Sequence, residues 1–332
     1  MSGPAVAAPT RSPWLTGRVW RQVFRDRPII PLLGLLVVLI VVLELARPGI
    51  LARGNWPGVT IRQAIPLALL AAAQTLTMLT GGIDLSVGIV ASMVAYLAAT
   101  QSTAQGPEVA ILIAFAAAAL VGLANGIGVG LFRVHPLIMT LGISLVVPGL
   151  VSVYQLLMVR AGVSIPGVVV TLGSGTQGPI PNSLIVFVPI AAAVLIGLRR
   201  SGFGRLLFAI GDNPVAARLS GVRAWLVIVA LYILSALIAA VAGLLVAGLT
   251  KTASPTLAQD LVLPSVAAAV IGGTSIMGGR GGYAGTIVGA LILTVLGTLL
   301  TVLRMPEGVR LVLFGAIILA VAAAYTRITE ET

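Results

Sequence analysis

The feature that most constrains this chain is a series of apolar runs, each long enough to cross a lipid bilayer. The first extends from Pro28 to Ala46 and reads PIIPLLGLLVVLIVVLELA. A helix of that length covers about 30 Å, the thickness of the hydrocarbon core. Further runs follow at 60–80, 84–100, 109–131, 136–159, 183–198, 224–249, 261–277, 283–303 and 309–325. The sequence predicts an all-α integral membrane protein with about ten transmembrane helices, or eight or nine if one run is re-entrant.

Composition supports a lipid environment. Only 9% of the residues are charged and the mean hydropathy is +1.12, whereas a soluble domain carries about 25% charged residues. The basic residues fall at the ends of the apolar runs, where they orient membrane helices, so we do not expect nucleic acid as a partner. The chain has no cysteine, which excludes disulfides and thiolate metal sites.

The arginines also predict the topology. Residues 1–27 hold five of them and are followed by no small-residue cleavage site, so we expect a cytoplasmic basic segment rather than a signal peptide. Alternation through a transmembrane domain at 28–325 then places the loop 199–223 and the tail 326–332 in the cytoplasm, with both chain ends inside. The segment 160–183 falls outside, and its Gly, Pro and Ser content predicts an irregular surface loop.

Residues 203–223 form a basic insert between two apolar runs, FGRLLFAIGDNPVAARLSGVR. Asn213 suits a helix N-cap, Pro214 the first helical position and Gly221 the residue just past the end. The two-turn helix that they delimit, Pro214–Ser220, is too short to be stable alone in water. From the spacing it is either a helix resting on the membrane surface or an element that docks on a cytoplasmic protein.

Three motifs give the chain a resemblance to a known family. They are LTGGIDLSVG (79–88), FGRLLFAIGDNPVAARLSG (203–221) and AVIGGTSIMGGRGGYAGTIVGA (269–290). In this order and spacing they resemble permease subunits of bacterial ABC importers for ribose, xylose, arabinose and related sugars. The larger group also contains importers of branched-chain amino acids, nucleosides and autoinducer-2. The similarity covers about residues 28–325.

The resemblance implies a fold like the type II permease of the vitamin B12 importer and a multi-pass location in the bacterial plasma membrane. It implies three protein partners: a cytoplasmic ATPase, often a fused tandem, that binds ATP and magnesium; an extracytoplasmic sugar-binding protein; and a second permease subunit, identical or related. It further implies that the insert is a coupling helix seated in the ATPase, with contacts from Gly204, Arg205, Asn213, Pro214, Ala216, Ala217, Arg218 and Gly221. Relatives usually carry Glu-Ala-Ala where this chain has Val-Ala-Ala at 215–217, which puts a salt bridge at that position in doubt.

Four polar residues are candidates for a translocation path or gate. Asp84 follows two glycines at a turn close to the membrane, and a charged group there is costly unless it faces a cavity or a partner. The alternative is that Asp84 caps the start of the next helix. Gln74 and Asn125 lie within apolar runs and either line a sugar path or bond neighbouring helices. Ser86, two residues after Asp84, belongs to the same group of candidates.

Glycine patterns and missing motifs complete the expectations. Gly122, Gly126 and Gly130, like Gly281, Gly285 and Gly289, are spaced by four, as in a dimer or gate interface or in ordinary packing within one chain. The loop 272–282 is glycine-rich but lacks the phosphate-binding pattern, so we expect no ATP hydrolysis and no bound cofactor in this chain. An ion-coupled transporter remains the alternative, with one acidic candidate, Asp84. An enzyme lacks a visible catalytic cluster.

Overall fold

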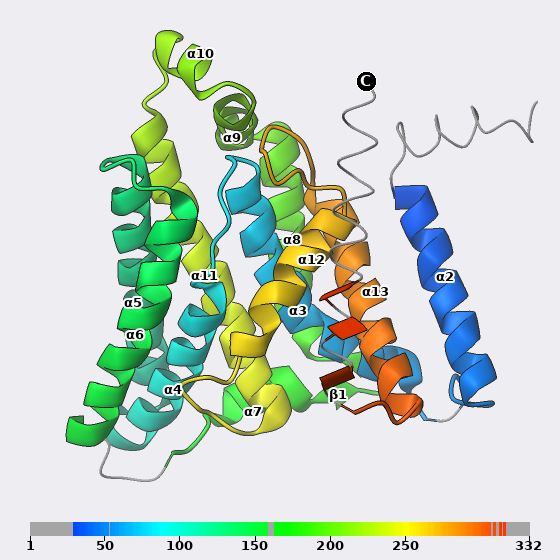
Figure 1. Cartoon of the computed structure of the whole chain (residues 1–332). Helices are drawn as coiled ribbons and strands as arrows, with labels where there is room; N and C mark the ends of the chain where they lie inside the picture. Colours follow the sequence, from blue (N-terminus) through cyan, green and yellow to red (C-terminus); the bar gives the residue numbers. More distant parts are fainter. Residues whose placement is uncertain are drawn as a thin grey trace, which may run out of the picture.

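The computed structural model describes residues 29–52, 54–158 and 163–306, together with 308–309, 312–313 and 315–316. Apart from one two-stranded antiparallel hairpin and a short 3₁₀ turn, its described elements are helices (Figure 1). In chain order these are α2 (Ile29–Ala46), α3 (Trp56–Met78), α4 (Val87–Gln105), α5 (Pro107–Gly130), α6 (Pro136–Met158), α7 (Gly167–Ser174), β1 (Thr176–Gln177), β2 (Ile180–Pro181), α8 (Ser183–Arg200), α9 (Gly202–Asp212), α10 (Pro214–Leu219), α11 (Ala224–Thr250), η2 (Gln259–Leu261), α12 (Val262–Ile271) and α13 (Tyr283–Val302).

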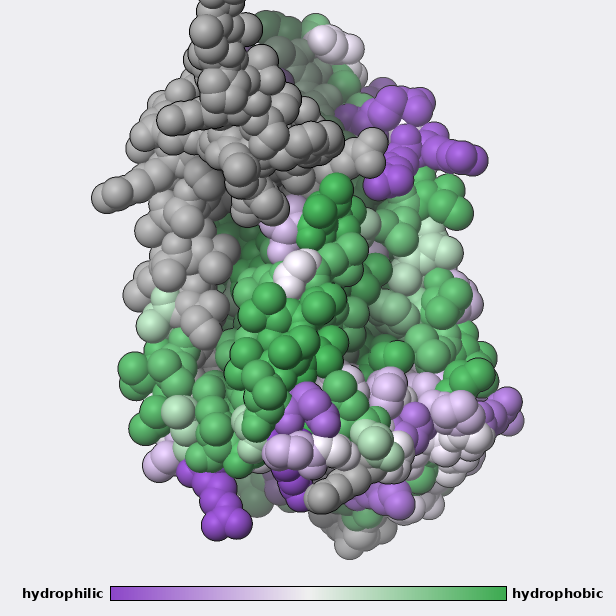
Figure 2. Space-filling model, turned by 90° about the vertical axis from the view of Figure 1, so that its right-hand side faces the viewer, coloured by the Kyte–Doolittle hydropathy of each residue, from purple (hydrophilic) through white to green (hydrophobic). Residues whose placement is uncertain are grey.

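Eight helices in the described part of the chain are long and apolar enough to cross a membrane. They are α2, α3, α4, α5, α6, α8, α11 and α13. Figure 2 shows apolar side chains gathered across the middle of one face and hydrophilic ones toward its ends, as a bilayer requires. The protein is therefore an all-α membrane bundle. The expected basic segment 1–27 and tail 326–332 lie outside the described residues.

Two of the ten expected spans differ from this set. The run 261–277 was wrongly expected to cross the bilayer, because its helix α12 has ten residues and a length of about 15 Å. The chain leaves the helix at Gly272 and turns at Gly273, whose φ of 88° favours glycine. Most of the run 309–325 lies outside the described residues.

The longest helix, α11, forms the centre of the bundle and packs against α3, α4 and α5. On the other side of α3, α13 packs against α12 and carries the peripheral helix α2 (Figure 1). The short helices α9 and α10 lie at the same end of the bundle as the α12–α13 loop, at the top of Figure 1, and α7 and the hairpin lie at the opposite end. We call these the α10 end and the α7 end.

Two segments without helical structure return into the bundle from opposite ends. After α3 the chain turns at Leu79–Gly82 and runs inward as far as Ser86 before α4 begins, while residues 251–258 do the same between α11 and η2. The second segment reaches the first turns of α4, where the Ala258 amide donates to Ser92 Oγ at 2.9 Å. Irregular backbone at membrane depth is tolerated where protein surrounds it. The interior therefore contains polar backbone that side chains must satisfy.

The spaced glycines serve packing within the chain. A Cβ at Gly122, Gly126 or Gly130 would lie 2.6–2.8 Å from backbone atoms of α11, so these glycines let α5 and α11 approach closely. Gly285 and Gly289 face the α12 backbone in the same way. Gly281 precedes α13 and lies against Thr274, so it is not part of the second helix face as the spacing suggested.

The segment 160–183 is more regular than expected. Its described part contains α7 and the β1–β2 hairpin, and α7 packs against the end of α11 where Gly173 and Gly248 meet. The Arg62 side chain donates to the Ser174 carbonyl at 2.7 Å and ties α3 to the end of α7. The expectation of a wholly irregular loop was wrong because its Gly and Pro content concealed the apolar run Val168–Val170.

Candidate functional site

The basic insert contains two helices, of which the sequence revealed only the second. Helix α9 begins at the cap residue Ser201, whose Oγ accepts from the Gly204 amide at 3.0 Å. It buries Leu207 and Ile210 on one side and leaves Arg205 exposed on the other. Gly204 touches the end of α8 so closely that a Cβ would overlap the carbonyl oxygen of Leu198. This apolar face therefore fixes α9 to the bundle.

Helix α10 has the caps that the sequence predicts. Asn213 Oδ1 accepts from the amides of Val215 and Ala216 at 3.0 and 2.9 Å, and Pro214 occupies the first turn. At the other end, Gly221 adopts a φ of 83° and the Val222 amide donates to the Ala217 carbonyl at 3.2 Å. These bonds satisfy both termini of a helix of six residues.

The outer surface of α10 is apolar and basic. Ala217 is buried against the protein, whereas Val215 is 55% and Leu219 85% exposed. Arg218 is exposed and its Nε donates to the Pro214 carbonyl at 3.1 Å. Val215 and Leu219 are therefore available either to a partner protein or to the membrane surface, the two alternatives that the sequence left open. Of the residues expected to contact an ATPase, Gly204 and Ala217 are buried, whereas Arg205, Asn213, Pro214, Ala216, Arg218 and Gly221 are exposed.

The four candidate path residues form one connected polar cluster inside the bundle. Gln74 holds the backbone of Asp84 with both ends of its amide: Nε2 donates to the Asp84 carbonyl at 2.6 Å, and Oε1 accepts from the Asp84 amide at 3.2 Å. The same pairing joins two backbone amides in a sheet. Gln74 therefore replaces the helical bonds that the inward-running segment lacks.

The carboxylate of Asp84 is satisfied by hydroxyl and amide donors. Oδ1 accepts from the Ser86 amide at 2.9 Å and from Ser86 Oγ at 2.6 Å, and Oδ2 accepts from Ser235 Oγ at 3.1 Å. Asn125 Nδ2 in turn donates to Ser86 Oγ at 2.8 Å. The cluster thus joins the inward-running segment to α3, α5 and α11.

The alternative that Asp84 caps the next helix is wrong. The cap residue of α4 is Ser86 and not Asp84, and the single backbone bond to the carboxylate comes from Ser86 itself. Asp84 therefore closes a local turn just ahead of the helix. None of Gln74, Asp84, Ser86 and Asn125 is more than 2% exposed, so none of them faces an open path in this conformation.

Two members of the cluster were missed from the sequence. Thr140 Oγ1 on α6 accepts from the Leu85 amide at 3.1 Å and contacts the Ile83 carbonyl at 3.3 Å, and Ser235 on α11 contacts Asp84. Both are single hydroxyl residues within apolar runs, where a bond to their own helix is equally common. Only the fold, which places both hydroxyl groups beside the inward-running segment after α3, distinguishes them from other such residues.

One buried acceptor in the cluster has no partner. Asn125 Oδ1 is enclosed and receives no hydrogen bond from the described residues. No group of three or more metal-binding side chains occurs among the described residues. The cluster can therefore hold backbone and side chains in register by hydrogen bonding, but it offers no acidic or imidazole ligand set for a cation.

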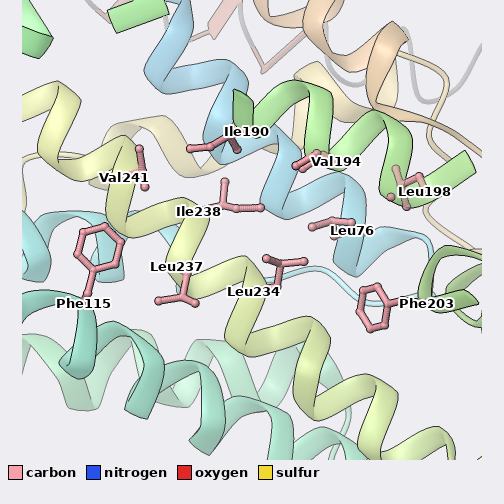
Figure 3. A pocket seen from close by; sticks show the side chains of 12 residues that line it. Leu76, Phe115, Ile190, Val194, Leu198, Phe203, Leu234, Leu237, Ile238 and Val241 are labelled. Carbon is pink, nitrogen blue, oxygen red and sulfur yellow. The ribbon is translucent and has the colours of Figure 1, made fainter. Parts of the chain in front are cut away.

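An apolar cavity between helices of the bundle shares no lining residue with this cluster. A cavity of about 330 Å³ is lined by apolar side chains from five helices, among them Leu76, Phe115, Ile190, Phe203 and Leu234 (Figure 3). A second cavity of about 530 Å³ lies at the α10 end between Arg199, Phe208 and the glycine-rich start of α13. Neither cavity is lined by any of the four path candidates.

Comparison with known proteins gives consistent matches over most of the chain. Residues 58–322 match a family described as branched-chain amino acid transport system, permease component. The chain is 34% identical to the ribose import permease protein of Bacillus subtilis over 297 residues, which are 87% of this chain and 89% of that protein. It is 32% identical to the Escherichia coli ribose import permease over 86% of this chain and 89% of the relative, and 31% identical to the fructose import permease of Rhizobium meliloti over 78% and 75%. No solved structure matches.

Proposed function

Because the chain belongs to the permease-component family of branched-chain amino acid transport systems, we propose that it is the permease subunit of an ATP-binding-cassette importer for a monosaccharide. The observation that carries this proposal is the similarity to ribose and fructose import permeases over most of both chains. The eight apolar helices suit a multi-pass protein of the bacterial inner membrane. The chain acts as a transport subunit and not as an enzyme.

The proposed partners follow from the chemistry of the two ends. At the α10 end, the exposed Leu219, Val215 and Arg218 form a small surface for a cytoplasmic ATPase, which supplies ATP and magnesium. We assign the α7 end to the extracytoplasmic side, where a binding protein delivers sugar. A second permease subunit, identical or related, completes the path. In this arrangement the fold is of the vitamin B12 importer type and both chain ends are cytoplasmic.

Transport in this proposal is alternating access without covalent chemistry. ATP binding closes the ATPase pair and displaces α10, hydrolysis resets it, and the bundle opens first to one side and then to the other. The binding protein selects the sugar. This chain contributes shape, and in the outward or inward state its polar cluster supplies hydrogen-bonding groups such as Asn125 and Gln74 near the path.

The test is reconstitution. The purified chain, its partner ATPase and the binding protein are placed in liposomes, and ATP hydrolysis is measured over a panel of pentoses and hexoses, with nucleosides and branched-chain amino acids as the alternative solutes. We expect one or a few sugars to stimulate hydrolysis and to accumulate. Uptake that continues without ATP but with an ion gradient would instead indicate a secondary transporter.

A further inference from the structure

The three sequence motifs that mark this chain meet at one point in the structure. Leu79 and Gly81 lie at the end of α3, Gly211 and Asp212 at the end of α9, and Gly278 and Gly279 in the α12–α13 loop. Their contacts are between backbone atoms. We call this meeting point the glycine junction.

The approach of the three segments is as close as backbone allows. A Cβ on Gly211 would overlap the Leu79 carbonyl oxygen and would lie 2.5 Å from the Gly279 amide nitrogen. The Gly279 amide also donates to the Leu79 carbonyl at 3.0 Å. A Cβ on Gly279 would lie 3.0 Å from Asp212 Cα, at a φ of 71° that itself favours glycine.

The loop side of the junction is closed on itself. The Ser275 amide donates to the Arg280 carbonyl at 3.0 Å, and the Met277 amide donates to Ser275 Oγ at 3.2 Å. This leaves the Met277 side chain 85% exposed at the tip. The α12–α13 loop is therefore a compact unit that can move together with the ends of α3 and α9.

Each of the three segments at the junction continues into a different part of the protein. One residue after Asp212, Asn213 caps α10. Three residues after Gly81, Asp84 enters the buried polar cluster. Gly279 belongs to the loop that connects the half-span α12 to α13. Packed backbone transmits displacement because close-packed interiors have low compressibility.

We infer that the glycine junction is the coupling element of the permease: it joins α10 rigidly to the inward-running segment and to the α12–α13 loop, so that displacement of α10 moves the buried cluster. Gly211 is the positioning residue at its centre. This inference depends on the proposed function, because it needs an ATPase that displaces α10. It extends the role of α10 from a docking element to one end of a defined mechanical connection.

The first experiment tests rigidity and uses the absence of cysteine from the chain. Ser220→Cys and Met277→Cys, at two exposed residues outside the surface assigned to the ATPase, carry a pair of spin labels in the reconstituted importer. Their separation is measured without nucleotide and with ATP under conditions that block hydrolysis. We expect the same separation in both states. A separation that changes with nucleotide overturns the inference, because α10 and the loop then move independently.

The second experiment separates docking from coupling. In Gly211→Ala the added methyl group pushes the three segments apart, while α10 and its caps are unchanged. We expect ATPase association as in the wild type and a loss of about tenfold in ATP-driven sugar uptake, within the range that mutations along a coupling network produce. Gly202→Ala on the same helix is the control, because nothing but the tip of Arg205 lies within 4 Å of its Cβ.

The outcomes test the glycine junction separately from the proposed function. A folded Gly211→Ala protein that transports like the wild type overturns the junction and leaves the importer intact. If Gly211→Ala does not fold, the spin-label measurement, made with Gly211 intact, still decides. If the wild-type chain neither binds an ATPase nor transports sugar with ATP, the proposed function itself fails.

Discussion

At the scale of single residues, Asp84 is a buried carboxylate that hydroxyl groups stabilise. Three donor atoms, two from Ser86 and one from Ser235, point at it, and among the described residues no lysine or arginine pairs with it. An unpaired charge inside a membrane protein is costly. These donors therefore stabilise the carboxylate in the non-helical segment between α3 and α4.

Asp84→Ala should destabilise the protein by about 1–3 kcal/mol, because it leaves the hydroxyl and amide donors of the cluster without their acceptor. Asp84→Asn keeps an acceptor oxygen and should lose much less. Thermal unfolding in detergent and sugar uptake measure the two effects. If both variants unfold and transport like the wild type, the cluster has neither a structural nor a transport role.

Gln74→Leu removes both bonds to the Asp84 backbone from a site that is fully buried. We expect a loss of stability of about 1–3 kcal/mol, since the amide and carbonyl of Asp84 are left unpaired. Gln105→Leu, on an exposed face at the end of α4, is the matched control and should be near neutral. Equal unfolding temperatures for the two variants would contradict the assignment.

At the scale of elements, α10 depends on its caps because six residues cannot sustain a helix. Asn213→Ala should weaken the helix by about 0.5–2 kcal/mol, and Asn213→Asp should preserve it. Copurification with the ATPase is the measurement, and only the alanine variant should lose the partner. Retention of the ATPase by Asn213→Ala would argue that docking does not need a formed helix.

Val215 stands in the first turn of α10 and is exposed. Val215→Glu places an acid near the positive end of the helix and should stabilise it by about 0.3–1 kcal/mol. Slower hydrogen exchange at the amides of residues 217–220 would report this gain. Val215→Gln is the uncharged control, and an equal effect in both variants would exclude the helix dipole as the cause.

The sequence was sufficient for elements whose signals are local. The caps of α10 and the eight long apolar helices follow from residue order alone. Helix α9 was missed although its signal is local: Leu207 and Ile210 lie on one face and Arg205 on the other, the pattern of an amphipathic helix. The end of α12 at Gly272 was missed because two glycines in an apolar run are also compatible with a continuous membrane helix.

The residues of the candidate site were predictable from the sequence, but the hydrogen bonds between them were not. Gln74, Asp84, Ser86 and Asn125 were each recognisable as polar groups in apolar surroundings. These residues form one hydrogen-bonded cluster only because of how α3, α5 and α11 pack. The contributions of Thr140 and Ser235 depend on the same kind of packing. Such long-range contacts leave no periodic signal in the sequence.

At the scale of the whole molecule, the two ends differ enough for a direct test of topology. Leu219→Cys at the α10 end and Ile180→Cys at the α7 end are both exposed, at 85% and 58%. In intact cells whose outer membrane is made permeable, a thiol reagent that cannot cross the inner membrane should label Ile180→Cys alone. After lysis and removal of the ATPase both positions should react. Labelling of Leu219→Cys in intact cells would reverse the orientation.

Helix α2 stands apart from the rest of the bundle. Within Ile29–Ala46, all of which the structure describes, only Leu43 is buried, and the helix packs chiefly on α13. Leu32, Leu36 and Leu39 are half-buried against the core, whereas the exposed side chains, among them Val37, Val38 and Leu45, form a surface suited to lipid. On that exposed surface one apolar residue can therefore replace another with little effect on the remaining fold, whereas the face that packs on α13 is constrained in size and shape.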